Sequence, residues 1–405
     1  MLTTVIYRSH ICDTFSLISL EKMVAAAKVK NEQANVTGIL LFNGKHFFQL
    51  LEGPEEGVQQ IYQHIINDER HHNLVELLRD YGPSRRFGKV GMELFDLREF
   101  ARNDVLQHVL DKGTTRYQLA FNDRPLKFFR TFIEATEKEN YFAIPPANTW
   151  EFIAEGVSRE KSVQEDTHAE CCFAFQPLID PFAREIVALE ALLRTPDGQG
   201  PERYFAGLTG TALYEADLHS KTQAFALAGR LNLQRYSLSV NVLPMTLVNI
   251  PHAVQTLLDA IERSGLVPEQ VTVEFTEREV ISGLEQFTAS VRLLKSAGIS
   301  VAIDHFGAGS AGLLLLSQFQ PDRIKINREL IMDVHKSGPR QAIVQAIVKC
   351  CSSLEIAISA VGVEKAEEWM WLESAGISQF QGYLFARPSL GGVSPIAWPE
   401  RAADL

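Results

Sequence analysis

The sequence lacks any long apolar run. Its longest uninterrupted apolar stretches, such as Leu313–Leu316, are far shorter than the roughly 18 residues that span a bilayer. The first residues, Met1 to Arg8, also lack the basic segment and long apolar core of an export signal. These absences predict a cytoplasmic protein that makes no use of a membrane.

Cysteine is scarce and badly placed for cross-linking. The five cysteines include two adjacent pairs, Cys171–Cys172 and Cys350–Cys351, besides Cys12. Neighbouring cysteines are poor disulfide partners, and no pair has the CxxC spacing of a zinc site. The pattern excludes a disulfide framework and indicates buried or idle thiols.

Positive charge is also in deficit. Lys and Arg number 39 against 50 Asp and Glu, which gives a formal net charge of −11. Non-specific nucleic-acid binding needs clustered Lys and Arg to displace counterions from phosphates. We therefore expect no direct DNA binding, although a local basic or metal-lined pocket can still hold a small anion.

The chain has 405 residues and is long enough for an α/β protein of two or three domains. Residues 2–95 follow a strand, helix, hairpin, helix, strand, strand order, with Asn43-Gly44 at the tight turn of the hairpin. Two helices on one face of such a sheet form a ferredoxin-like α+β domain. We place this domain at 1–97 and a helical connector and linker at 98–167.

From Phe173 onward, short apolar segments alternate with helix-length stretches. Eight strands with intervening helices over about 230 residues predict a TIM-like (β/α)8 barrel, placed at 168–405. The connection Pro181–Glu185 is too short for a crossover helix, so we expect the first two strands to be antiparallel. The segments are 173–179, 186–193, 237–243, 271–276, 300–306, 323–327, 356–363 and 380–385.

Five of these strands each carry one ionisable or amide side chain at or near the C-terminal end, where barrels collect catalytic residues. Three carboxylates and one amide oxygen would form an oxygen-rich site suited to Mg²⁺ or Mn²⁺. Each residue alone is better explained as an ordinary polar strand end. Several buried like charges together, however, need a metal or a lysine as counter-ion. The residues are Glu190, Asn241, Glu274, Asp304 and Lys325.

Motifs along residues 173–399 resemble those of the EAL family, whose active members hydrolyse cyclic di-GMP with two metal ions. The matching stretches are Gln176-Pro-Leu, Glu190-Ala-Leu-Leu-Arg194, Val240-Asn241, Glu274-Phe-Thr-Glu277, Asp304-His-Phe-Gly307, Lys325-Ile, Gly362-Val-Glu364 and Gln381-Gly-Tyr-Leu-Phe.

The resemblance implies a role for each of these polar residues. Lys325 would orient the attacking water, and Arg194 would contact the ligand phosphate. Glu277 and Glu364 join Glu190 and Lys325 in the catalytic group. The first metal would be held by Glu190, Asn241, Glu274 and Asp304.

Two positions depart from the pattern of active members. Those members usually carry Asp where this chain has His305, and Glu where it has Val361. In active relatives both carboxylates help to hold the second metal, but imidazole suits Mg²⁺ poorly and valine cannot coordinate a metal. We therefore expect an intact first metal site, a crippled second site and a vestigial catalytic group.

Residues 1–95 resemble the BLUF family of flavin-using blue-light sensors. The resemblance is carried by Val36-Thr-Gly-Ile-Leu-Leu-Phe, by Phe47-Phe-Gln-Leu-Leu-Glu-Gly53 and by Tyr7, Asn31, Arg70 and Met92. It implies non-covalent FAD between the two helices.

The same resemblance assigns roles around the flavin. Asn31 would bond the flavin ring, while Asp68 and Arg70 would help to hold its polar edge or tail. Tyr7 would donate an electron and a proton on excitation, and Gln49 would then change its hydrogen bonds, since an amide has both donor and acceptor atoms. Met92 would carry the change outward.

Two functions from different classes remain open. The overall domain arrangement, including the departures at His305 and Val361, resembles that of the blue-light-regulated antirepressors. In these proteins a degenerate barrel binds a MerR-type repressor and releases it from DNA. The alternative is a light-activated phosphodiesterase, with a non-cleaving cyclic di-GMP receptor between the two. The missing carboxylates favour the non-enzymatic hypothesis. We also expect a homodimer, because related barrels commonly pair.

Overall fold

The computed structural model divides into two compact units. One comprises Met1–Ile144 with Asp333–Ala342, and the other comprises Pro145–Met332 with Ile343–Leu405. The last part of the expected connector and linker, from 156 to 167, lies outside the described residues. The structure describes residues 2–12, 17–82, 85–89, 91–99, 102–111, 124–134, 144–155, 171–277, 283–309 and 312–402.

The first unit is built on a five-stranded sheet. Its strands are β1 (Leu2–Ile11), β2 (Thr37–Phe42), β3 (His46–Pro54), β4 (His71–Gly82) and β5 (Gly91–Asp96). They lie in the order β4-β1-β3-β2-β5, with β2 and β5 parallel and the other neighbours antiparallel. The predicted hairpin turn is present: Gly44 has a φ of +98°, which glycine adopts without strain.

Helices cover both faces of this sheet. As predicted, α1 (Leu17–Gln33) and α2 (Glu55–Ile66) pack on one face, where Leu20 and Tyr62 join the apolar clusters of the strands. The connector supplies α3 (Arg102–Asp111) and α4 (Arg124–Glu134), which cover the other face. The rings of Phe48 and Phe132 stack there with centroids 4.9 Å apart. The helices expected to act as a connector therefore complete the core of the first unit.

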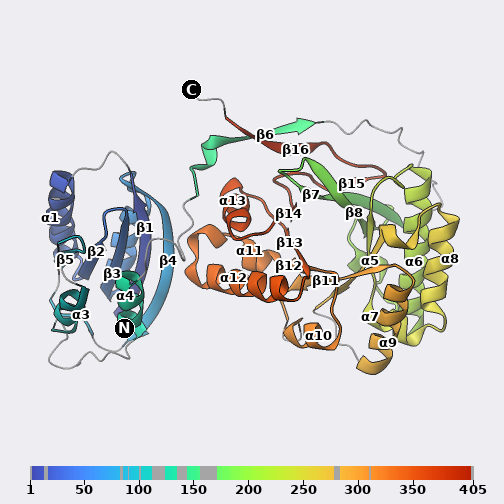
Figure 1. The fold of residues 1–405 in the computed structure, drawn as a ribbon, viewed down its shortest axis with the longest axis horizontal. Coiled ribbons are helices and arrows are strands. Elements are labelled where there is room, and N and C mark those ends of the chain that lie inside the picture. Colours follow the sequence, from blue (N-terminus) through green and yellow to red (C-terminus); the bar gives the residue numbers. More distant parts are fainter. Residues whose placement is uncertain are drawn as a thin grey trace. The chain divides into compact units, whose positions relative to one another are not determined.

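The second unit contains the predicted eight-stranded barrel. Figure 1 shows its strands following one another in chain order from green to red, and β14 closes the barrel by pairing with β7. As expected from the short connection, β7 and β8 are antiparallel. The strands are β7 (Cys172–Asp180), β8 (Glu185–Arg194), β9 (Leu238–Asn241), β10 (Val271–Thr276), β11 (Ser300–Phe306), β12 (Arg323–Ile326), β13 (Ala357–Val361) and β14 (Gln379–Gln381), with β15 (Ser389–Leu390) paired to β7.

Helices connect most of the barrel strands. Among the described residues, none of the helices combines the length and apolar character that crossing a bilayer requires. The helices are α5 (Pro201–Tyr204), α6 (Thr211–Arg230), α7 (Pro244–Asn249), α8 (Ala253–Arg263), α9 (Leu284–Ser296), α10 (Gly312–Gln318), α11 (Arg328–Ile331), α12 (Gly338–Ser353) and α13 (Ala366–Ser374), with short 3-10 turns at Ala147–Thr149, Pro268–Gln270 and Val334–Lys336.

A separate two-stranded sheet joins the region before the barrel to the C-terminal end. It pairs β6 (Trp150–Glu155) antiparallel with β16 (Ile396–Arg401). The Trp150 ring lies 5.0 Å from the buried Trp369 ring of α13. The local sequence pattern does not predict a strand at β6, because its partner β16 lies more than two hundred residues away.

Candidate functional sites

A cavity of about 530 Å³ lies between α1, α2 and the sheet of the first unit. Its walls include Val24 and Ala27 from α1 and Ile61 and Ile65 from α2. Polar side chains from the strands and from the ends of the helices also reach it. An apolar cavity with a few placed polar groups is the usual form of a cofactor site.

Tyr7, Gln49 and Met92 form a hydrogen-bonded chain beside this cavity. Tyr7 and Gln49 are cross-strand partners on β1 and β3. Tyr7 Oη donates to Gln49 Oε1, and Gln49 Nε2 donates to Met92 Sδ at 3.4 Å. Burial raises the pKa of Tyr7, so its hydroxyl stays protonated and remains a donor at neutral pH.

Asn31 reaches the same place from the end of α1. Its Nδ2 donates to the Gly91 carbonyl oxygen at 3.1 Å. Gly38 makes the approach possible: a Cβ atom there would lie 2.5 Å from Asn31 Nδ2 and 2.9 Å from Met92 Sδ. A glycine inside a strand often marks such a close approach. The missing side chain at Gly38 therefore leaves the space in which Asn31 and Met92 meet.

Charged groups lie at the edge of the cavity. Arg70 Nε donates to Asp68 Oδ1 at 2.8 Å, and this bond lowers the pKa of Asp68. Lys30, which the sequence analysis did not select, also lines the cavity. Apolar walls suit a flavin ring, and the two cations suit the phosphates of its tail. The residues present therefore fit a flavin nucleotide.

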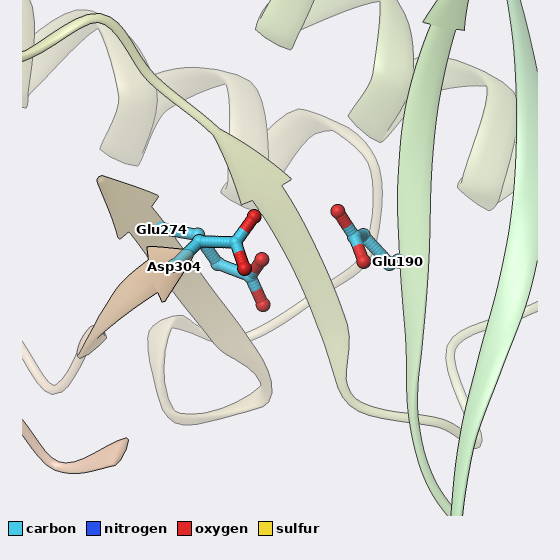
Figure 2. A group of neighbouring side chains, drawn as sticks. All are labelled: Glu190, Glu274 and Asp304. Atoms are coloured by element: carbon cyan, nitrogen blue, oxygen red, sulfur yellow. The ribbon is translucent and has the colours of Figure 1, made fainter. Parts of the chain in front are cut away.

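In the second unit three carboxylates meet inside the barrel (Figure 2). Glu190, Glu274 and Asp304 come from β8, β10 and β11, and one oxygen of each lies within 4.8 Å of the others. All three residues are buried, and Figure 2 shows their oxygens turned toward one another. The predicted convergence of these strand residues is therefore present, and the oxygen set fits Mg²⁺ or Mn²⁺.

Lys325 and Asn241 are bonded into this cluster. Lys325 Nζ lies 2.6 Å from Glu190 Oε2 and 2.7 Å from Glu274 Oε2. Asn241 Nδ2 donates to Glu190 Oε1 at 2.7 Å. Gln381, which the sequence analysis did not choose as a site residue, donates to Glu190 Oε2 at 3.0 Å. We refer to Glu190, Glu274, Asp304 and Lys325 as the carboxylate–lysine cluster.

The pKa values of the cluster residues depend on their burial and on the charges of their neighbours. Burial alone would raise the pKa of Glu190, but the charge and hydrogen bond of Lys325 outweigh it and lower that pKa. Burial raises the pKa of Glu274 to about 7 despite Lys325. The carboxylates raise the pKa of Lys325 in spite of its burial. The lysine is therefore a permanent cation inside the cluster.

The cluster opens into a cavity of about 500 Å³ that is also lined by Arg194 and His305. His305 is 47% exposed, and its Nε2 lies 3.5 Å from Asp304 Oδ2. Its backbone is left-handed, with φ of +56°, which is uncommon for a residue with a side chain. Val361 ends β13 with a buried apolar side chain. An imidazole and an alkyl group therefore lie at the two positions where the family resemblance predicts carboxylates.

Glu277 and Glu364 make contacts of another kind. Both oxygens of Glu277 accept backbone N–H groups, from Gly307 at 2.6 Å and from Gly312 at 2.7 Å. Glu364 accepts from Arg328 Nη2 at 2.8 Å, and both side chains are substantially exposed. Glu277 therefore holds the backbone after β11, while Glu364 forms a surface ion pair.

A second buried ion pair, between Lys221 and Asp217, lines this cavity and was not predicted from the sequence. Lys221 Nζ lies 2.7 Å from Asp217 Oδ1 on α6. Asp217 Oδ2 accepts from the Leu243 N–H at 3.0 Å and from Thr246 Oγ1 at 2.7 Å. The pair thereby fixes the turn that follows Asn241. Its i, i+4 spacing was the available signal, but that spacing is also typical of a solvated helix face.

Comparison with known families matches both units. Residues 2–93 match the BLUF family, described as sensors of blue-light using FAD, and residues 160–388 match the EAL domain family.

A curated relative and two solved structures match the whole chain. The blue light- and temperature-regulated antirepressor BluF of Escherichia coli K12 is 58% identical over 402 residues, which are 99% of this chain and 100% of BluF. Klebsiella pneumoniae BlrP1 in complex with calcium and cyclic di-GMP is 42% identical, with a TM-score of 0.90. BlrP1 with FMN and cyclic di-GMP, without metal ions, is 38% identical, with a TM-score of 0.85. Each match to BlrP1 covers 99% of this chain and 100% of the other.

Proposed function

The chain belongs to the family of blue-light antirepressor homologues that join a BLUF domain to an EAL domain, and on this premise we propose that its barrel releases a MerR-type repressor from DNA under light control. The proposal assigns light sensing to residues 1–97 together with the helices α3 and α4 that complete their core, connection to the rest of 98–167 and repressor binding to 168–405. It takes FAD as the chromophore and a homodimer as the working form.

Light sensing would depend on the hydrogen-bonded chain beside the cavity. FAD, when bound, supplies blue-light absorption and an electron acceptor. Tyr7 would donate an electron and its proton, and Gln49 would then exchange donor and acceptor atoms toward its neighbours. Because Gln49 bonds both Tyr7 and Met92, one rearranged amide changes contacts on β1, β3 and β5 together.

One observation carries the proposal of a barrel that binds rather than cuts. His305 and Val361 occupy the positions of the second-metal carboxylates. Without two metals, the attacking and leaving oxygens are not stabilised together, so turnover would be weak.

A phosphodiesterase, or a receptor that binds cyclic di-GMP without cleavage, is the second candidate. It is favoured by the convergence of Glu190, Asn241, Glu274 and Asp304 beside a cavity lined by Arg194. The BlrP1 structures, which contain cyclic di-GMP, point the same way. In this role Lys325 would orient water and Arg194 would hold phosphate.

Two assays separate the candidates. Purified protein loaded with FAD should be yellow and should show a reversible absorption shift under blue light. Hydrolysis of cyclic di-GMP is then measured with Mg²⁺ and with Mn²⁺, in darkness and under blue light. We expect binding at most and little turnover. Efficient light-stimulated cleavage would place the phosphodiesterase first, whereas the absence of any flavin signal would remove the light-sensing proposal.

A further inference from the structure

Tyr62 on α2 packs beside Tyr7, the residue to which the proposal assigns the photochemistry. Its ring centroid is 5.7 Å from that of Tyr7, with the planes inclined by 54°. Both side chains are buried in one apolar cluster, which includes Val5 and Leu51. The Tyr7 ring therefore packs against a second phenol ring within the core. Because the core is close-packed, a displacement of one ring changes the contacts of the other.

The hydroxyl end of Tyr62 meets a charged pair on β4. Burial, followed by the charge of Glu76 and a hydrogen bond to it, raises the pKa of Tyr62. Arg79 holds Glu76 through two bonds, from Nε at 2.9 Å and from Nη2 at 2.8 Å. The Arg79 Cζ also lies 5.6 Å from the centre of the Tyr62 ring. This bidentate pairing fixes the Glu76 carboxylate in one orientation.

The strand register brings the same carboxylate back to Tyr7. Glu76 is the cross-strand partner of Tyr7, and Arg79 is the partner of Val5. The pairing of β1 with β4 shifts between Ile6 and Tyr7, which leaves Leu77 as an extra residue on β4. Such bulges are frequent beside functional sites, where they let a strand change its local geometry. Tyr7 thus reaches β4 both through the backbone and through Tyr62.

We propose that Tyr62, Glu76 and Arg79 form a positioning group that holds the Tyr7 ring and transmits a change at Tyr7 to β4. This inference rests on the proposed photochemistry of the first unit. A change in the hydrogen bonding of Tyr7 alters its contact with Tyr62, and the Tyr62 hydroxyl passes that change to the Glu76 carboxylate. Tyr62 touches neither flavin nor substrate in this scheme and acts through Tyr7.

The test is the light-minus-dark infrared difference spectrum of full-length protein loaded with FAD. The wild type should show a carboxylate band that disappears in Glu76→Gln, which identifies it as Glu76. Tyr62→Phe keeps the ring contact and removes the hydroxyl. It should retain the visible absorption shift, lose the Glu76 band and change the rate of dark recovery at least threefold.

Two further variants keep the test decisive. Tyr81→Phe is the matched control, since Tyr81 is an exposed tyrosine of β4, the strand that carries Glu76. This variant should leave both the Glu76 band and the rate of dark recovery unchanged. Arg79→Lys replaces the two-pronged guanidinium with a single ammonium charge and should shift the Glu76 band without abolishing it. This variant identifies the band if Glu76→Gln does not fold.

The outcomes distinguish the inference from its premise. A Tyr62→Phe spectrum and recovery rate that match the wild type overturn the inference, as does a wild-type spectrum without any band sensitive to Glu76→Gln or Arg79→Lys. A wild-type protein that shows no absorption shift at all instead contradicts the proposed photochemistry.

Discussion

Lys325 Nζ lies 2.6 Å from Glu190 Oε2, so an internal cation balances the carboxylates of the barrel. Buried carboxylates that lack a counter-ion repel one another and lose their hydration. Here the lysine bonds to two of them, which lets the cluster persist without a metal. The buried acidic residues of the barrel are therefore compatible with a stable fold even when no metal is bound.

Removing this cation tests its structural role. Lys325→Met should lower the free energy of unfolding by about 3–5 kcal/mol, because it leaves buried carboxylates without their partner. Urea unfolding in the absence of metal measures the loss. Lys295→Met is the control: its pair with Asp322 is largely exposed, so less than about 1 kcal/mol should be lost. Equal losses in the two variants would contradict the argument.

Metal binding should depend on pH through Glu274. Its pKa of about 7 means that the carboxyl must release a proton before it can bind a metal. Mn²⁺ affinity should therefore rise about fivefold from pH 6 to pH 7 and only about twofold from pH 7 to pH 8, where it levels off. Calorimetric titrations at pH 6, 7 and 8 measure this slope. A flat profile would show that Glu274 is not a ligand.

Restoring the missing carboxylates should restore turnover. The double variant His305→Asp with Val361→Glu should hydrolyse cyclic di-GMP on the order of 10²–10³ times faster than the parent, because both reacting oxygens can then be stabilised. The two single variants are controls and should gain less. Unchanged turnover in the double variant would place the defect elsewhere in the barrel.

Three histidines that are cross-strand neighbours, His10, His46 and His72, predict that the fold loses stability in acid. His10 pairs across the strands with His46 and His72, and its pKa falls to about 3 through burial and these neighbours, with Arg8 adding positive charge. The folded pKa is depressed, so stability is full above the unfolded value of about 6.5 and falls as pH drops toward 3. Near pH 5 the loss should reach about 2 kcal/mol.

Urea unfolding at pH 7.5 and pH 5 measures this loss. His10→Gln should flatten the dependence, while His64→Gln, at an exposed position of α2, should leave it unchanged. An undiminished pH dependence in His10→Gln would assign the acid sensitivity to other groups.

The space at Gly38 should be essential for the flavin site. A Cβ at this position would lie 2.5 Å from Asn31 Nδ2, so Gly38→Ala must displace Asn31 or Met92. The bound flavin per chain, read from the visible absorption, should fall at least tenfold, or the light-induced shift should change in size. Gly392→Ala, where nothing lies within 4 Å, is the control. Normal flavin content with a normal shift would refute the assignment.

Features that depend on local chemistry were predictable from the sequence. Asn43-Gly44 specifies the hairpin, and the short link at Pro181–Glu185 forces antiparallel pairing. Glu190, Glu274 and Asp304 were expected to converge, because strand ends of a barrel share one rim, and they do.

Features created by packing between distant elements were not predictable. A counter-ion role for a lysine was predicted beside a role in orienting water, but the place of Lys325 between Glu190 and Glu274 depends on side-chain reach across the barrel. Tyr62 carries no motif, and its place behind Tyr7 follows from how α2 docks on the sheet. Helices α3 and α4 were read as a connector, because their apolar faces do not reveal which surface they cover.

Release of a MerR-type repressor from its operator is the most direct test of the account. The repressor–DNA complex is followed by gel shift with added FAD-loaded protein, in darkness and under blue light, while cyclic di-GMP is assayed in the same samples. The account predicts release that depends on light, with cyclic di-GMP left intact. Equal release in darkness and light, or release only as cyclic di-GMP is consumed, would contradict it.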